Sequence, residues 1–300
     1  MASPLDPEEL GTSTQPVAAE IAASTALGAV HLSVSDLARS VSYYRDAVGL
    51  ALLDEQPGGA RLGVGARELL RLVELPGATP EVPSTGLYHF ALLLGERADL
   101  ASWLLHAIRD RVTLTGLSDH FVSEALYLTD PDGHGIEIYW DRPRELWEGQ
   151  VASRMTTAPL DVDSLIGELR EPPVGPFEGL PAGAVMGHVH LKVSDVAETV
   201  AFYRDVLGFG LMAQLGGSAA FLGAGGYHHH IGANTWESAG ASPPGPGHTS
   251  LLMATLVVPD TPERERVAAR VREAERPIHD SEAGPILEDP SGNRLLLAVA

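Results

Sequence analysis

Apolar and polar residues alternate over residues 30–34 and again over residues 189–193, as in a strand that is buried on one face. Apolar residues at helical spacing follow each of these segments. They are Leu37, Val41, Tyr44 and Val48 in the first copy and Val196, Val200, Tyr203 and Leu207 in the second. Asp36 and Asp195 stand where an N-cap belongs, and Gly49 and Gly208 stand where the helices should end. The sequence therefore predicts one strand–helix unit twice.

Residues 28–52 and 187–211 align without a gap at an offset of 159 residues, and about half of the aligned positions are identical. An internal repeat of this kind fixes the architecture before any single residue does. Short strands are predicted to follow each helix. Their ranges are 50–54, 61–64 and 68–74 in the first copy and 210–215, 219–222 and 228–233 in the second.

A fainter version of the same plan follows each copy. One has strands at 87–94, 114–117, 124–128 and 135–140 and a helix at 98–109, and the other has strands at 251–258, 278–280, 284–288 and 294–299 and a helix at 261–275. The chain is thus predicted to be an α+β protein of four βαβββ modules in two domains, and we number the modules one to four in chain order. The predicted parts are a mobile tail (1–24), a first domain (25–145), a linker (146–184) and a second domain (185–300). One short helix is predicted within the linker, at 161–169.

The composition narrows the functional classes. A formal net charge of -20 argues against nucleic acids and anionic membranes as partners, since both require a basic surface. The chain has no cysteine, which excludes disulfides and thiolate chemistry. No apolar run approaches the ~20 residues of a membrane span, and the acidic N-terminal segment has no signal-peptide pattern. We therefore expect a cytoplasmic protein.

These motifs resemble the vicinal oxygen chelate superfamily, which includes glyoxalase I, fosfomycin-resistance enzymes and extradiol dioxygenases. The resemblance rests on the two strands with their capping aspartates, on the FYRDVLG helix end at 202–208 and on the DPDGHGIE segment at 130–137. It covers nearly all of the chain after residue 25, and the layout is most similar to bacterial catechol 2,3-dioxygenases. It implies mixed-sheet cups made of paired modules, with metal ligands on the first and last strands of the modules.

The resemblance implies three ligand positions. The ligand of the first strand lies seven residues before the capping aspartate. This position is His188 in module three but Ala29 in module one. His89 stands where module two opens its strand, and the carboxylate of the last strand corresponds to Glu137, whereas module four has Leu296 there. Modules two and three thus each hold part of a set, and modules one and four hold none.

Two histidines and one carboxylate are the ligand set of non-haem Fe(II) enzymes. His89, Glu137 and His188 would complete this set if module two pairs with module three across the domain boundary. The complementary loss of ligands from the outer modules motivates this hypothesis. A large separation of His89 from His188 would contradict it.

A second motif favours the extradiol enzymes within the superfamily. Their pattern runs from a histidine through a Leu-Tyr pair to DPxG and the ligand glutamate, and here it contains His120, Tyr127 and Glu137. Ser118 departs from the usual residue, and His134 replaces the common asparagine. By resemblance, His120 and Tyr127 line the substrate pocket and hydrogen-bond the substrate oxygens.

The tract His228-His229-His230 is the remaining cluster of histidines. In extradiol enzymes this module supplies a histidine that acts as acid and base at the bound oxygen. Strand alternation places His228 and His230 toward the cup and His229 toward the helices, and we favour His230 over His228. An exposed metal-binding tract is the simpler alternative. His190 shares a face with His188, so it is a candidate neighbour of the metal.

The function implied by the resemblance is ring cleavage of a catechol-type diol by O₂, with Fe(II), or else Mn(II) or another divalent metal, as the cofactor. One alternative is a glyoxalase-like isomerase or transferase on Ni(II), Zn(II) or Mn(II), and another is a non-catalytic protein of the bleomycin-resistance type. Whether the chain forms a homodimer stays open. The other histidines are expected to be structural or exposed: His31, His106, His248 and His279.

Overall fold

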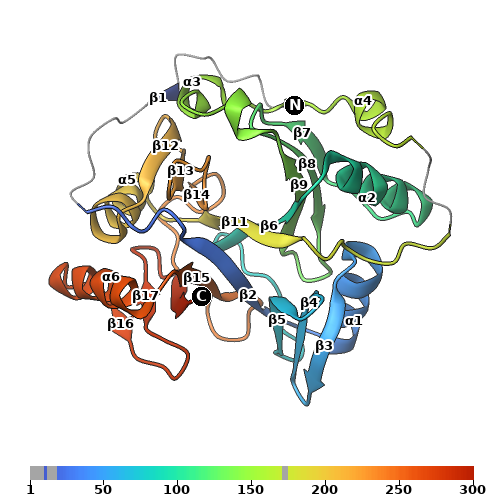
Figure 1. Cartoon of the computed structure of the whole chain (residues 1–300). Coiled ribbons are helices and arrows are strands. Elements are labelled where there is room, and N and C mark those ends of the chain that lie inside the picture. Colours follow the sequence, from blue (N-terminus) through green and yellow to red (C-terminus); the bar gives the residue numbers. More distant parts are fainter. Residues whose placement is uncertain (1–9, 12–18, 171–174) are drawn as a thin grey trace.

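The computed structural model describes residues 10–11, 19–170 and 175–300 (Figure 1). Within these ranges the strands form two mixed sheets, one of ten strands and one of eight. Helices pack against the strands of their own modules, so the fold is α+β as predicted. Most of the predicted tail, residues 1–9 and 12–18, lies outside the described residues, as do residues 171–174 of the predicted linker.

The ten-stranded sheet contains modules two and three together with two short edge strands. Its strand order is β1 (Leu10–Gly11), β12 (Gly210–Leu215), β13 (Ala219–Gly223), β14 (Ile231–Asn234), β11 (Val185–Lys192), β6 (Gly86–Leu94), β9 (Gly135–Asp141), β8 (Ser123–Thr129), β7 (Gly116–Asp119) and β10 (Ala158–Pro159). The two modules join where β6 pairs with β11 in antiparallel fashion.

The eight-stranded sheet contains modules one and four. Its order is β16 (Ile278–His279), β17 (Ile286–Glu288), β18 (Arg294–Val299), β15 (Leu251–Val258), β2 (Ala26–Val34), β5 (Arg67–Glu74), β4 (Gly59–Val64) and β3 (Ala51–Gln56). Here β2 pairs with β15, again antiparallel. Each sheet thus takes strands from both halves of the chain, and the pairing of module two with module three that the ligand pattern predicts is present. The domain boundaries stay a prediction.

The repeated helices have the predicted caps. Asp36 accepts a hydrogen bond from the backbone N–H of the third residue of α1 (Leu37–Tyr43), and Asp195 does the same for α5 (Val196–Val200). A π-helical segment that the sequence did not predict continues each helix, η2 (Tyr44–Val48) and η4 (Ala201–Leu207). Both segments end at a glycine with φ near 95°, Gly49 and Gly208, as predicted.

The π-helical segments carry a contact that joins neighbouring modules. The hydroxyl of Tyr44 donates to Asp130 at 2.8 Å, and that of Tyr203 donates to Asp289 at 3.3 Å. Each aspartate belongs to the DP turn of the next module along the chain. Module one is therefore tied to module two, and module three to module four, although the members of each pair lie in different sheets.

The remaining helices are the long α2 (Arg97–Arg109) and α6 (Thr261–Glu273) and three short ones in the middle of the chain. These are the 3-10 turn η3 (Arg144–Leu146), α3 (Val151–Arg154) and α4 (Val162–Ile166). Only α4 corresponds to the predicted linker helix, and it is shorter. The buried indole of Trp147, which donates to the carbonyl of Arg142 at 2.9 Å, anchors the start of this segment against the ten-stranded sheet. None of the helices in the described ranges is both long and apolar enough to cross a membrane.

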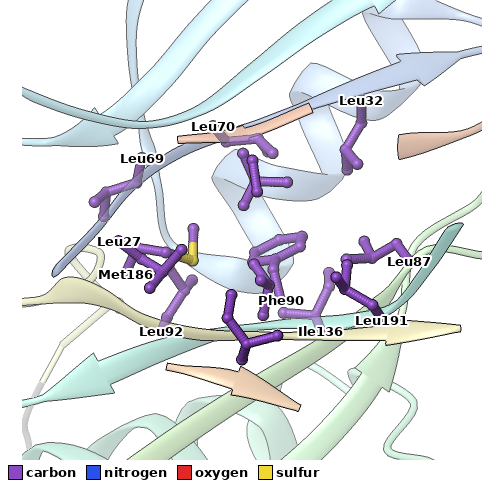
Figure 2. Close-up of a cluster of buried hydrophobic side chains, with 14 of the residues drawn as sticks. Leu27, Leu32, Leu69, Leu70, Leu87, Phe90, Leu92, Ile136, Met186 and Leu191 are labelled. Carbon is purple, nitrogen blue, oxygen red and sulfur yellow. The ribbon is translucent and has the colours of Figure 1, made fainter. Parts of the chain in front are cut away.

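The main core lies between the two sheets. Figure 2 shows Leu32 and Leu70 of the eight-stranded sheet facing Phe90 and Leu191 of the ten-stranded sheet across this layer. Because side chains alternate along a strand, His89, next to Phe90, lies on the opposite face of the ten-stranded sheet. The face away from the core is therefore the place for a polar site.

Candidate metal centre

His89, Glu137 and His188 lie on three neighbouring strands, β6, β9 and β11, with β6 in the centre. Ala91 of β6 is the register partner of both Glu137 and His188, and His89 lies two residues away on the same face. Ala91 is fully buried, and its small side chain leaves space between the flanking residues. The three side chains therefore converge above Ala91.

The donor atoms of these residues face one another. Nε2 of His89 lies 3.0 Å from Oε2 of Glu137 and 3.4 Å from Nε2 of His188, which in turn lies 3.1 Å from the same carboxylate oxygen. All three side chains are buried. Within the described ranges this is the one cluster of three or more His, Cys, Asp or Glu residues whose ligand atoms all lie within 4.8 Å of one another.

The electrostatics suit metal ligation. Burial alone would raise the pKa of Glu137, but the charges and hydrogen bonds of His188 and His89 hold this pKa well below its usual range. Burial lowers the pKa of His188 even though Glu137 opposes the shift. An ionised carboxylate and a neutral imidazole are the protonation states that a divalent metal requires. Two imidazoles and one carboxylate also fit the ligand set of a non-haem iron site.

His120 and Tyr127 lie beside this cluster. Nε2 of His120 is 2.7 Å from the hydroxyl of Tyr127, and Nδ1 donates to the backbone carbonyl of Thr156 at 2.8 Å. Because a carbonyl can only accept, Nδ1 of His120 carries a proton, which leaves Nε2 to accept from Tyr127. The ring of Tyr127 lies 5.6 Å from that of His89. The structure thus brings both predicted pocket residues to the cluster, and their roles stay a prediction.

The histidine tract differs from the prediction in its local structure. Strand β14 begins at Ile231, so the three histidines lie in the loop before it. Nδ1 of His230 accepts from the backbone N–H of Ala224, and the ring lies 6.3 Å from the core residue Phe209. Burial lowers the pKa of His230 to about 3. The predicted orientation of His230 toward the cup is therefore wrong, because strand alternation does not extend into a loop.

His229 is the residue that the sequence reasoning missed. Its ring centroid lies 4.2 Å from that of His188, and burial lowers its pKa well below the ordinary value. His228, in contrast, turns away to the carboxylate of Asp141. The two glycines just before the tract have positive φ, and this Gly-Gly turn signal could have indicated a late strand start.

His190 lies where its strand position predicts, with its ring 5.0 Å from that of His89. Its Nε2 atom is buried and has no hydrogen-bond partner among the described residues. The rings of Tyr88 and Trp236 pack around it at 5.2 and 5.7 Å. The rings of Tyr88, His190 and Trp236 thus pack against one another beside the metal cluster.

Three histidines away from the metal cluster have structural or surface environments, as expected. His106 binds the backbone carbonyl of Ala47 and the carboxylate of Asp110, His248 binds the carbonyl of Thr79, and His279 is exposed.

His31, on the eight-stranded sheet, gives an acid-sensitive contribution to stability. Burial and the neighbouring Arg71 lower its pKa from 6.5 to about 4, although Glu68 opposes the shift. The unfolded chain therefore binds more protons between these pH values, so stability is complete above about pH 6.5 and falls as the pH approaches 4. Between about pH 7.5 and 5, the unfolding free energy of the variant His31→Gln should therefore fall by roughly 1–2 kcal/mol less than that of the wild type.

Urea unfolding of the wild type and His31→Gln at both pH values measures this difference. His279→Gln changes an exposed histidine and is the control. Equal pH dependence of the unfolding free energy in both variants would contradict the prediction.

Comparisons with known proteins agree with this architecture. The model of the Glyoxalase/Bleomycin resistance protein/Dioxygenase superfamily matches residues 26–138 and again residues 185–297. A protein of Bacillus subtilis strain 168 named catechol-2,3-dioxygenase is 41% identical over 272 residues, which cover 89% of this chain and 94% of that protein.

Two solved structures show the likeness at the level of the fold. A second Bacillus subtilis strain 168 protein has a TM-score of 0.64 at 13% identity, covering 94% of this chain and 86% of that one. Glyoxalase I from Zea mays has a TM-score of 0.54 at 16% identity, covering 91% of this chain and 92% of its own. Identities this low support the fold and no more.

Proposed function

Because the chain belongs to the Glyoxalase/Bleomycin resistance protein/Dioxygenase superfamily, we propose that it is a metal-dependent extradiol dioxygenase. It opens the ring of a catechol-type diol with O₂. The observation that carries the proposal is the convergence of His89, Glu137 and His188 beside His120 and Tyr127. The name of the relative at 41% identity supports the same reaction class.

In this proposal His89, His188 and Glu137 hold a divalent metal ion, Fe(II) or else Mn(II), through two nitrogens and one carboxylate oxygen. A bound metal of this kind brings a diol and dioxygen into one coordination sphere and passes electron density between them. Three protein ligands leave positions for both reactants. One carboxylate leaves a divalent site with net positive charge, which attracts an anionic diolate.

The neighbouring polar residues would orient the diol and move its proton. Tyr127 and His120 form a hydrogen-bonded pair that faces the cluster, so they can hold a substrate oxygen there. His229, in place of the predicted His230, is positioned to accept the proton that a diol hydroxyl loses on binding. Burial lowers the pKa of His229, so the ring is unprotonated at neutral pH.

The product would result from cleavage of the ring bond beside the diol, with both atoms of O₂ incorporated. For catechol itself this gives a 2-hydroxymuconic semialdehyde, which is yellow. The packed rings of Tyr88 and Trp236 beside the cluster suit contact with a flat aromatic substrate.

The proposal is tested by loading anaerobically purified protein with Fe(II), or in parallel with Mn(II), and adding catechol in air. We expect a yellow product and the uptake of one O₂ per diol. Turnover of a hemithioacetal in place of catechol would instead indicate a glyoxalase-like enzyme. A pocket that binds an organic ligand without any stoichiometric metal would indicate a binding protein of the bleomycin-resistance type. Either result would overturn the dioxygenase proposal.

A further inference from the structure

A chain of hydrogen bonds runs behind His188, from the ring of His229 to the end of strand β9. The Nδ1 atoms of His229 and His228 lie 2.8 Å apart, and Nε2 of His228 lies 2.8 Å from Oδ1 of Asp141. His228 is completely buried, whereas the side chain of Asp141 is 18% exposed. The chain thus connects the ring that packs on His188 with the outer end of β9.

The direction of the hydrogen bonds at Asp141 follows from the donors around it. The hydroxyl of Tyr227 donates to Oδ2 at 2.7 Å, and the hydroxyl of Tyr139 lies 2.8 Å from that of Tyr227, so Tyr139 donates to Tyr227. Burial raises the pKa of both tyrosines, which keeps them protonated. The carboxylate accepts from Tyr227 and leaves Oδ1 for His228, which must therefore carry a proton on Nε2.

The hydrogen bond at Asp141 also determines which nitrogen of His229 carries the proton. With the proton of His228 on Nε2, its Nδ1 atom is the acceptor for Nδ1–H of His229. Neutral His229 then has its own lone pair on Nε2. The ring of Tyr227, 4.1 Å from that of His228, and the ring of Trp147 at 5.6 Å pack against His228 and restrict its rotation.

The repeat shows that the fold does not require this chain of residues. By strand register and by distance from the DP turn, the corresponding positions in the eight-stranded sheet are Arg67, Glu68 and Ala300. Arg67 binds a backbone carbonyl of the connecting segment and Glu68 pairs with Arg71, so neither continues into a buried network of this kind. The hydrogen-bonded chain therefore accompanies the ligand cluster and not the scaffold.

On the basis of the proposed function, we propose that Asp141 and His228 are positioning residues that orient His229 and fix its proton on Nδ1. This leaves the lone pair of Nε2 available to the substrate. Neighbours that set the tautomer of a histidine in this way are a common requirement of metal and acid–base sites.

The transfer of the diol proton to His229 balances as follows within the residues of this chain. The O–H bond of the bound diol breaks, and an N–H bond forms at Nε2 of His229. The Nδ1 proton of His229 can pass to Nδ1 of His228, where the carboxylate of Asp141 balances the positive charge. No electron is transferred, and the reverse movement returns the proton to the ring-opened product.

Nitrogen-15 NMR of histidine-labelled protein tests the tautomers directly. Zn(II) serves as a diamagnetic probe because it accepts two imidazoles and a carboxylate. We expect His229 to be protonated on Nδ1 alone and His228 on Nε2 alone. A His229 ring protonated on Nε2 alone, or a doubly protonated His228, would overturn the proposal.

Two substitutions at one position sharpen the test. His228→Asn retains an acceptor where Nδ1 stood, whereas His228→Gln retains only a donor where Nε2 stood. We expect the asparagine variant to preserve the tautomer of His229 and most of kcat. The glutamine variant and Asp141→Ala should lose the tautomer and lower kcat by about 10- to 100-fold, with KM nearly unchanged.

His31→Gln changes a mostly buried histidine in the other sheet and is the control for both readouts. Equal tautomers and equal kcat in the two variants of His228 would overturn the proposal, even if Asp141→Ala fails to fold. The NMR readout does not depend on turnover. A protein with the expected tautomers that cleaves no catechol would contradict the proposed function alone.

Discussion

Replacing His188 by alanine should leave the protein folded and abolish stoichiometric metal binding. The substitution removes one of two imidazole donors and leaves His89 and Glu137, which cannot complete the coordination of a divalent ion. The folded state should persist because module one already carries Ala29 at the corresponding place in β2, within an intact sheet. The loss of ring-cleaving activity should exceed the ~10- to 100-fold effect typical of changing a neighbour of a ligand.

Metal analysis of anaerobically purified wild type and His188→Ala measures this effect. We expect one equivalent of metal in the wild type and almost none in the variant, with similar far-UV circular dichroism. His31→Ala removes a histidine from the corresponding strand of the other sheet and should retain full metal content. Equal metal content in the wild type and His188→Ala would refute the centre.

Separate production of residues 1–170 and 175–300 should give two fragments, neither of which folds normally. Fragment 1–170 contains β2 and β6 but not their partners β15 and β11, so the apolar edges of two half-sheets would be exposed. It also holds His89 and Glu137 without His188. We expect aggregation or loss of near-UV dichroism, and no metal binding, from either fragment alone.

The matched control is the full chain with a protease site between residues 170 and 175, cleaved after folding. We expect the cleaved protein to remain assembled and to retain its metal, because both sheets are already formed. Co-production of the two fragments should also restore metal binding. A fragment 1–170 that is monomeric, gives native-like near-UV dichroism and binds one equivalent of metal would contradict the prediction. The experiment also tests the predicted domain boundaries at residues 145 and 185.

Local features of the fold were predictable from the sequence because they depend on neighbouring residues. Asp36 and Asp195 cap their helices, and Gly49 and Gly208 end them, as the sequence predicts. The π-helical segments were not predicted. The first of them carries the contact of Tyr44 with Asp130, which lies 86 residues away in the chain and is not visible in the local pattern.

The candidate ligands could also be predicted from the sequence, since Glu137 and His188 occur at fixed spacing from recognisable aspartates. The arrangement above Ala91 was a hypothesis, because it depends on which strand edges meet in space. The orientation of His229 was predicted wrongly, since the strand was expected from residue 228 and starts only at Ile231, after a Gly-Gly turn that could have indicated this. Hydrogen-bond partners such as Asp141 are still less accessible, because they lie 87 residues from His228 in the chain.

The division of the centre between the two halves of the chain also has a consequence for biosynthesis. Ribosomes make the chain from its N-terminus, so His89 and Glu137 emerge first and His188 follows 51 residues after Glu137. The nascent N-terminal half therefore holds only two of the three proposed donors. In the proposed centre, metal capture would have to wait until β11 has been made and has paired with β6, so the ion would be selected by a nearly finished protein rather than by a growing one.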